Sequence, residues 1–210
     1  MQTTEGQTGI SVSGTGRVAI TPEIATLRAG VSLSGPSLED ARAAAATKIG
    51  AATQYLMSAG VAEGDIQTTR LNVHTSFDRE IRQQTYHLST GVEATIRDLA
   101  SAESIVNDLF TEIGDGIDMN GLTFGVEDPA TGRAEAIELA FEDAKTKAVQ
   151  LARLAGVGLG PVLAVSESQG QDHMGAPMMA MARRSGGDIP IAAGELDQQA
   201  TVSVRWAIDN

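Results

Sequence analysis

The sequence predicts an α+β protein that consists mainly of antiparallel sheet with packed helices. Several segments alternate apolar and polar residues, as strands with one buried face do, and three segments place apolar residues every three or four positions, as helices do. These segments follow one another in the order β-β-α-β-β-α-β-α-β-β. Because strands that follow each other directly usually pair antiparallel, this order favours antiparallel sheet over a parallel α/β fold.

The longest predicted helix lies between Asp128 and Gly156. Asp128 can cap its amino end, Pro129 suits its first turn, and Gly156 can end it in a left-handed conformation. The residues expected to face the core are spaced by three and four: Ala134, Ile137, Phe141, Ala144, Ala148, Leu151 and Ala155. This stripe is short and rich in alanine, which favours packing across a sheet over a coiled coil.

Two strands are predicted at the start of the chain. The first holds Ile10, Val12, Val18 and Ile20, with a bulge or sharp bend expected at Gly14-Thr15-Gly16. Gly14 to Ala19 also matches a relaxed dinucleotide-binding fingerprint, but that motif needs a helix after it. Pro22 and a second strand over 25–33 follow instead. The glycines are therefore interpreted as an irregularity in the strand.

The middle of the chain is predicted to hold two helices on either side of a β-hairpin. A capping pattern at Ser37 precedes a helix that ends at Gly60, and its inward face is Leu38, Ala41, Ala45, Ile49, Ala52 and Leu56. The hairpin pairs 66–77 with 86–96. The second helix, capped by Asp98 or Ser101 and stopped at 114–116, carries Ala102, Ile105, Val106, Leu109 and Ile113.

The last third of the chain holds three further predicted strands and a long loop. A strand over 119–126 precedes the long helix, a short strand over 162–165 follows it, and a strand over 200–208 closes the chain. The segment 170–187 is rich in Gly, Met and Arg and is expected to be a mobile loop. We expect one domain over 10–208, or two interlocked α/β subdomains, with a flexible tail at 1–9.

Composition excludes several classes of function. A net charge of −12 argues against binding to nucleic acid. The chain has no cysteine, so it has no disulfide, no catalytic thiol and no zinc site with cysteine ligands. No apolar run approaches the length of a transmembrane helix. Residues 1–9 lack the basic and apolar parts of an export signal, so the protein is either cytoplasmic or has lost a targeting segment.

Histidines and methionines are the candidate metal ligands. The predicted hairpin places His74 opposite His87, and with Asp78 these side chains would suit zinc or copper. A second group lies in the long loop, where soft thioethers suit Cu(I): His173, Met174, Met178, Met179 and Met181. Two alternatives stay open. The histidines can face each other without a metal, and the methionines can pack against a neighbouring subunit.

No arrangement of residues indicates catalysis. The chain has no Gly-x-Ser-x-Gly, His-Glu-x-x-His or Walker motif. The acidic residues of the long helix are expected to form a solvated face with its lysines: Glu135, Glu138, Glu142 and Asp143 with Lys145 and Lys147. We therefore expect a protein without enzymatic activity, catalytic residues or a cofactor.

Short segments distributed along the whole chain resemble the SIMPL-domain family of bacterial envelope and periplasmic proteins. They are Val12–Gly16 with Pro22–Ala25, Gly60-Val61 with Asp65–Thr68, Asn120–Phe124, Ala140–Gly156, and Ile189-Pro190 with Gly194-Glu195. Their order and spacing, rather than any single segment, carry the resemblance.

The resemblance implies a non-enzymatic protein of the periplasm or cell envelope whose export signal is absent from this sequence. It also implies assembly into a homo-oligomer with a scaffold or stress-related role. We expect the subunit contact on the long loop, the first strand and the edge of the last strand. The resemblance leaves open a lipid anchor and peripheral membrane association through that anchor. The alternative function is a periplasmic protein that binds a small ligand, copper or zinc through the candidate residues above.

Overall fold

The computed structural model describes residues 9–78, 83–114, 117–167, 191 and 193–209. The elements are β1 (Ile10–Ile20), β2 (Ile24–Gly35), α1 (Leu38–Ser58), β3 (Ile66–Asp78), β4 (Gln83–Ile96), α2 (Ala102–Ile113), β5 (Ile117–Gly125), α3 (Pro129–Ala155), β6 (Gly158–Glu167) and β7 (Leu196–Asp209). Short 3₁₀ helices precede β3 and α2. The predicted class and order of elements are confirmed. The tail expected at 1–9, apart from Gly9, and the loop expected at 170–187 lie outside the described residues.

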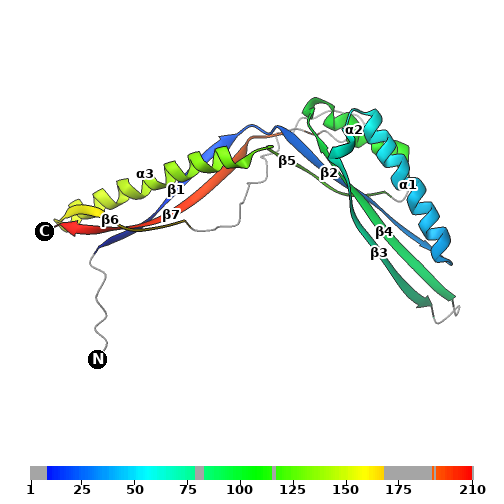
Figure 1. The fold of residues 1–210 in the computed structure, drawn as a ribbon, viewed down its shortest axis with the longest axis horizontal. Helices are drawn as coiled ribbons and strands as arrows, with labels where there is room; N and C mark the ends of the chain where they lie inside the picture. Colours follow the sequence, from blue (N-terminus) through cyan, green and yellow to red (C-terminus); the bar gives the residue numbers. More distant parts are fainter. Residues whose placement is uncertain (1–8, 79–82, 115–116, 168–190, 192, 210) are drawn as a thin grey trace. The chain divides into compact units, whose positions relative to one another are not determined.

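The described chain forms two compact units, each with its own sheet and its own hydrophobic core. The first unit holds β1, α3, β6 and β7. Its strands lie in the order β1-β7-β6 with antiparallel pairing, and α3 runs along β1 and β7 (Figure 1). The second unit has strand order β3-β4-β2-β5, also antiparallel, and α1 packs on β4, β2 and α2.

Helix α3 begins and ends as predicted, but its buried face differs from the expected one. Asp128 accepts a hydrogen bond from the N–H of Ala130, and Gly156 ends the helix with φ of 70°. The buried residues follow a strict step of four: Gly132, Ala136, Ala140, Ala144, Ala148 and Ala152. The expected stripe is wrong at its ends, because Ala134, Leu151 and Ala155 are exposed. A ridge of small residues lets the helix backbone approach the sheet, while Ile137 and Phe141 pack at its sides.

Strand β1 is continuous, so the bulge or bend expected at Gly14-Thr15-Gly16 is wrong. Each of its residues pairs in unbroken register with β7, from Ile10 opposite Trp206 to Ile20 opposite Leu196. The two glycines serve the contact with α3. A Cβ on Gly14 would lie 2.0 Å from the carbonyl oxygen of Ala140, and one on Gly16 would lie equally close to that of Ala136. The glycines are therefore the place where the helix backbone lies directly on the strand.

The second unit confirms most of the predicted faces. All five residues predicted to face inward on α2 are buried, and α1 buries Ala41, Ala45, Ala52 and Leu56. Ile49 packs at the border of this core, whereas Leu38, in the first turn of α1, is 42% exposed. The sheet contributes alternate residues to the same core: Ala25, Leu27, Ala29, Val31, Leu88, Val92, Ala94 and Ile96. The two helices and the sheet thus close around one apolar layer.

Strand β6 is longer than predicted, and β7 lies inside the sheet, although an edge was expected there. The pairing of β6 with β7 shifts register between Leu159 and Val162 and again before Ala164, so Gly160 and Pro161 lie within a bulged strand instead of preceding it. Pro161 is tolerated because β6 is an edge strand. β7 lies between β1 and β6. Over residues 202–206 the last strand therefore has a neighbour on both sides, and the subunit contact expected along its edge stays a prediction.

Candidate functional site

Strand β3 exposes apolar side chains at the edge of its sheet. Among the described strands it pairs only with β4, and Leu71 and Val73 lie opposite Thr90 and Leu88, which belong to the buried face. Leu71 is nevertheless 68% exposed, Val73 47% and Phe77 60%. Helix α1 packs on β4 and β2 and leaves this strand uncovered. We call Leu71, Val73 and Phe77 the β3 edge surface. Contiguous exposed apolar residues of this kind are typical of contacts between proteins.

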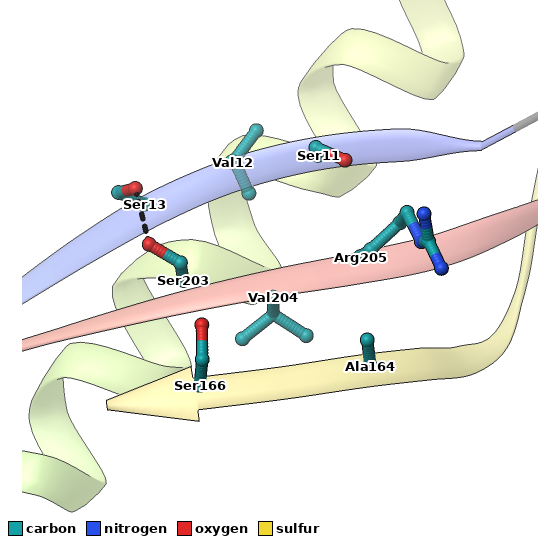
Figure 2. Close-up of a pocket in the computed structure, with 8 residues that line it drawn as sticks. All are labelled: Ser11, Val12, Ser13, Ala164, Ser166, Ser203, Val204 and Arg205. Carbon is teal, nitrogen blue, oxygen red and sulfur yellow. Dashed lines mark hydrogen bonds between the residues drawn. The ribbon is translucent and has the colours of Figure 1, made fainter. Parts of the chain in front are cut away.

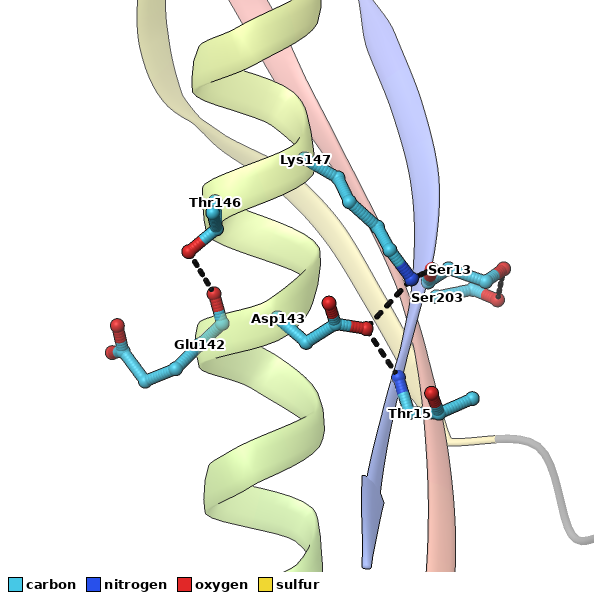
Figure 3. Close-up of polar contacts among 7 residues, drawn as sticks. All are labelled: Ser13, Thr15, Glu142, Asp143, Thr146, Lys147 and Ser203. Carbon is cyan, nitrogen blue, oxygen red and sulfur yellow. Dashed lines mark hydrogen bonds and ion pairs between the residues drawn. The ribbon is translucent and has the colours of Figure 1, made fainter.

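The free edge of β1, in contrast, is occupied by two side chains of α3 (Figure 3). Asp143 accepts hydrogen bonds from the backbone N–H of Thr15 at 2.8 Å and from Nζ of Lys147 at 2.6 Å. Lys147 also donates to the carbonyl oxygen of Ser13 at 3.1 Å. The bond from Lys147 and then that from Thr15 hold the pKa of the Asp143 carboxyl below its ordinary value. We call this pair the β1 edge clamp.

The clamp is not predicted by the sequence pattern, which places both residues on a solvated helix face. The neighbouring acidic residue Glu142 fits that expectation, since it is exposed and its carboxylate lies 3.8 Å from Nζ of Lys145. Asp143 and Lys147 are four residues apart, which is the spacing of an ordinary helical ion pair. They differ from such a pair only because β1 lies beside α3. The signal in the sequence for this close approach of helix and strand is a strand that contains glycines together with a helix rich in alanine.

The two histidines of the predicted hairpin lie together as expected. His74 pairs with His87 across β3 and β4, and their rings stack with centroids 4.8 Å apart and an interplanar angle of 11°. Both nitrogens of His87 are hydrogen-bonded, Nδ1 to Ser34 Oγ and Nε2 to Ser76 Oγ, each at 2.7 Å. Binding of a metal through His87 would therefore require the release of one serine.

The remaining candidate ligands are not placed by the structure. The side chain of Asp78 and the loop residues His173, Met174, Met178, Met179 and Met181 lie outside the described residues. Within the part that is described, no three histidine, aspartate or glutamate side chains come together as metal ligands would. The metal sites stay predictions.

Comparison with known families identifies the chain. The model of the SIMPL family, described as proteins of unknown function (DUF541), matches residues 10–206. The chain belongs to the SIMPL family. The match spans both units of the fold, from the first residue of β1 to Trp206 near the end of β7. The resemblance inferred from the short segments is thereby confirmed.

Relatives of this SIMPL-family chain come from several bacteria. The chain is 27% identical over 214 residues to the "26 kDa periplasmic immunogenic protein" of Brucella melitensis, and the alignment covers 95% of this chain and 84% of the relative. The protein of the same name from Brucella abortus has the same identity and coverage. The "Uncharacterized protein YggE" of Escherichia coli K12 is 24% identical over 204 residues, which cover 95% of this chain and 80% of the relative.

Neither the site geometry nor these relatives indicate a reaction. The family is described only as proteins of unknown function, and no enzymatic name occurs among the relatives above. Among the described helices, none has both the length and the apolar character that a membrane span requires. The described surface does carry the β3 edge surface and the β1 edge clamp.

Proposed function

We propose that this SIMPL-family chain is a non-enzymatic periplasmic protein that assembles with copies of itself in a scaffold or stress-related role. The names of its Brucella relatives support the periplasmic location. The observation that carries the assembly is the β3 edge surface, where Leu71 and Phe77 are both at least 60% exposed on an edge strand.

Assembly through the β3 edge surface would bury the exposed parts of Leu71, Val73 and Phe77. Full burial of a leucine, valine or phenylalanine side chain is worth about 1.5–3 kcal/mol, so the exposed parts of these three residues offer roughly 1 kcal/mol each. The regular part of β3, from Arg70 to Asp78, also has unpaired backbone groups along its outer side. Side chains and backbone together form a surface that a second copy can bury. A contact of this size gives association that depends on concentration.

The test is the solution mass of the wild-type chain and of two variants, measured by size-exclusion chromatography with light scattering over a wide range of concentration. Leu71→Thr/Phe77→Thr removes the two most exposed apolar side chains of the β3 edge surface and keeps residues with high strand propensity. Met57→Gln, at a residue 45% exposed on α1, is the control for the loss of an exposed apolar side chain. We expect a discrete oligomer for the wild type and Met57→Gln and a smaller species for the double variant.

A wild-type chain that stays monomeric at high concentration would contradict the proposal as a whole. An oligomer that persists in the double variant would contradict the assignment to β3 and leave self-assembly through another surface. Circular dichroism of both variants shows whether they have kept the fold, so that a loss of assembly is not confused with unfolding.

A second candidate function is binding of zinc or copper. The observation that favours it is the stacking of His74 and His87, which the hairpin holds 4.8 Å apart. Isothermal titration with Zn(II) and Cu(I) tests it, together with His74→Ala. Stoichiometric binding that His74→Ala abolishes supports the hairpin site, whereas binding that survives points to His173 and the loop methionines. Titration without stoichiometric binding excludes both groups.

A further inference from the structure

The sheet of the first unit carries a hollow between its three strands (Figure 2). Its volume is about 460 Å³, and its lining consists of Ser11, Val12, Ser13, Ala164, Ser166, Ser203, Val204 and Arg205. Val202 and Val204 pack towards the alanines of α3, so the alternate residues Ser203 and Arg205 point to the opposite face of the sheet. The small side chains of that face leave the hollow open. This volume is within the range of sites for small molecules.

Arg205 lies on this face and lines the hollow. In the register of the sheet it is opposite Ser11 on β1 and Ala164 on β6. Its Nε atom is buried and has no hydrogen-bond acceptor among the described residues. None of the eight lining residues is acidic. A buried donor without an acceptor is unfavourable and rare in folded proteins, so its presence indicates that something else supplies the acceptor.

Three other described arginines of the chain pair with carboxylates. Arg97 makes two hydrogen bonds to Asp65, of 2.9 and 3.0 Å, and also contacts Glu127. Arg28 pairs with Glu93, and Arg133 pairs with Glu167. The chain has 27 acidic residues and 15 basic ones, so carboxylates outnumber the basic side chains with which they can pair. At Arg205 the sheet offers serine hydroxyls instead.

The serines complete a set of donors suited to an oxyanion. Ser13 and Ser203 lie opposite each other and share a hydrogen bond of 2.8 Å between their Oγ atoms, and Ser166 is the partner of Ser203 on the other side (Figure 2). A hydroxyl both donates and accepts, so these groups can turn towards an anion or towards hydroxyl groups of a ligand. The guanidinium binds carboxylate and phosphate oxygens through paired N–H donors.

We propose that this hollow binds a small polar molecule through one singly charged oxyanion group, a carboxylate or a phosphodiester. Arg205 pairs with the oxyanion, while Ser13, Ser166 and Ser203 contact its remaining oxygens and neighbouring hydroxyl groups. Arg205 is the one cationic side chain among the eight lining residues, so the hollow suits a ligand group with one negative charge. This site is separate from the β3 edge surface, which belongs to the other unit, so the proposal does not depend on self-assembly.

The test is a titration of the ¹⁵N-labelled full chain followed by amide chemical shifts. The probes are sodium glucuronate for the carboxylate, diethyl phosphate for the phosphodiester and glucose as the neutral control. We expect saturable shifts at β1, β6 and β7 with at least one of the two anions and none with glucose. Which anion binds more tightly distinguishes a sugar acid from a phosphodiester such as a lipid headgroup. The absence of saturable shifts with both anions would overturn the proposal.

Three variants make the assignment specific. Arg205→Gln is expected to weaken anion binding at least tenfold, and Ser13→Ala/Ser203→Ala is expected to weaken it by a smaller factor. Arg17→Gln is the matched control, because Arg17 lies on the same face of β1, six residues along from the partner of Arg205. Equal affinity in Arg205→Gln and wild type would refute the site. If Arg205 stabilised the fold, Arg205→Gln would lower the melting temperature. Because its Nε is buried without an acceptor among the described residues, we expect the melting temperature of Arg205→Gln to stay the same or rise.

Discussion

Replacement of Gly14 by alanine is the most direct test of how the first unit is held together. In an ordinary strand this change is favourable, because glycine in a strand interior lacks a side chain and loses much conformational entropy on folding. Here we expect the opposite sign. The added Cβ would lie 2.0 Å from the carbonyl oxygen of Ala140 and 2.4 Å from the backbone nitrogen of Ala144.

The size of the effect follows from what must move. Ordinary contact with a Cβ begins at about 3.4 Å, so α3 has to retreat by about 1.4 Å at this point. Overpacking that side chains can absorb costs about 1–3 kcal/mol. Since both blocking atoms belong to the helix backbone, we expect about 3 kcal/mol, a large part of the stability of a typical domain. Ala144→Gly should not restore it, because the closest contacts are not with a side chain.

The assay is urea unfolding followed by the fluorescence of Trp206, the only tryptophan of the chain. It is 4% exposed and lies beside Phe141 of α3, with ring centroids 6.3 Å apart, so it reports on this interface. Gly132→Ala is the control. Its Cβ would meet the flexible end of Ile20, and the gain in helix propensity of up to about 1 kcal/mol offsets that contact. Equal unfolding midpoints for wild type and Gly14→Ala would refute the reasoning.

Two further predictions concern pH. The Lys147 ammonium and the N–H of Thr15 lower the pKa of Asp143, so its carboxylate stabilises the fold above the ordinary carboxyl pKa, and this contribution is lost as the pH falls through the lowered value. At neutral pH, Asp143→Asn should therefore unfold at a lower urea concentration than wild type. This difference in urea midpoint should disappear in acid, and a difference that is the same at both pH values would contradict the prediction. Burial, followed by the nearby charge of Asp108, raises the pKa of Tyr55 to about 12. The stability that neutral Tyr55 provides is present below pH 10 and is lost as the pH rises towards 12. The urea midpoint of Tyr55→Phe should therefore fall less in alkali than that of wild type. An equal fall in both proteins would contradict the prediction.

Much of the fold was predictable because its signals are local. The caps at Ser37 and Asp128 and the left-handed Gly156 depend on a few neighbouring residues, and they define helix ends whatever the rest of the chain does. The alternation in β4 and β7 is equally local. The hairpin register, set by these patterns, placed His74 opposite His87.

The errors occur where contacts between distant segments decide the structure. Gly14 and Gly16 were interpreted as a bend. Glycine is required there because the backbone of α3 leaves no room for a Cβ, and that helix lies more than a hundred residues further along the chain. The hollow around Arg205 was not predicted either, since it needs the strand order β1-β7-β6. Its only trace in the sequence is serine at alternate positions of the first strand, and such serines are common on exposed strand faces.

The edges of the two sheets differ in a way that favours association at β3. A free edge invites pairing with another chain, and bulges reduce that risk. Among the described strands, β6, β5 and β3 all show shifts of register, whereas β1 pairs regularly over its whole length. It is β1 that has Asp143 and Lys147 bonded to its outer backbone groups. Past its bulge near Thr69, β3 regains regular pairing and carries Leu71 and Phe77 without a similar clamp among the described side chains. Ser13 and Thr15 of β1 are therefore already bonded to α3, and we propose the regular part of the β3 edge as the place where a second copy binds.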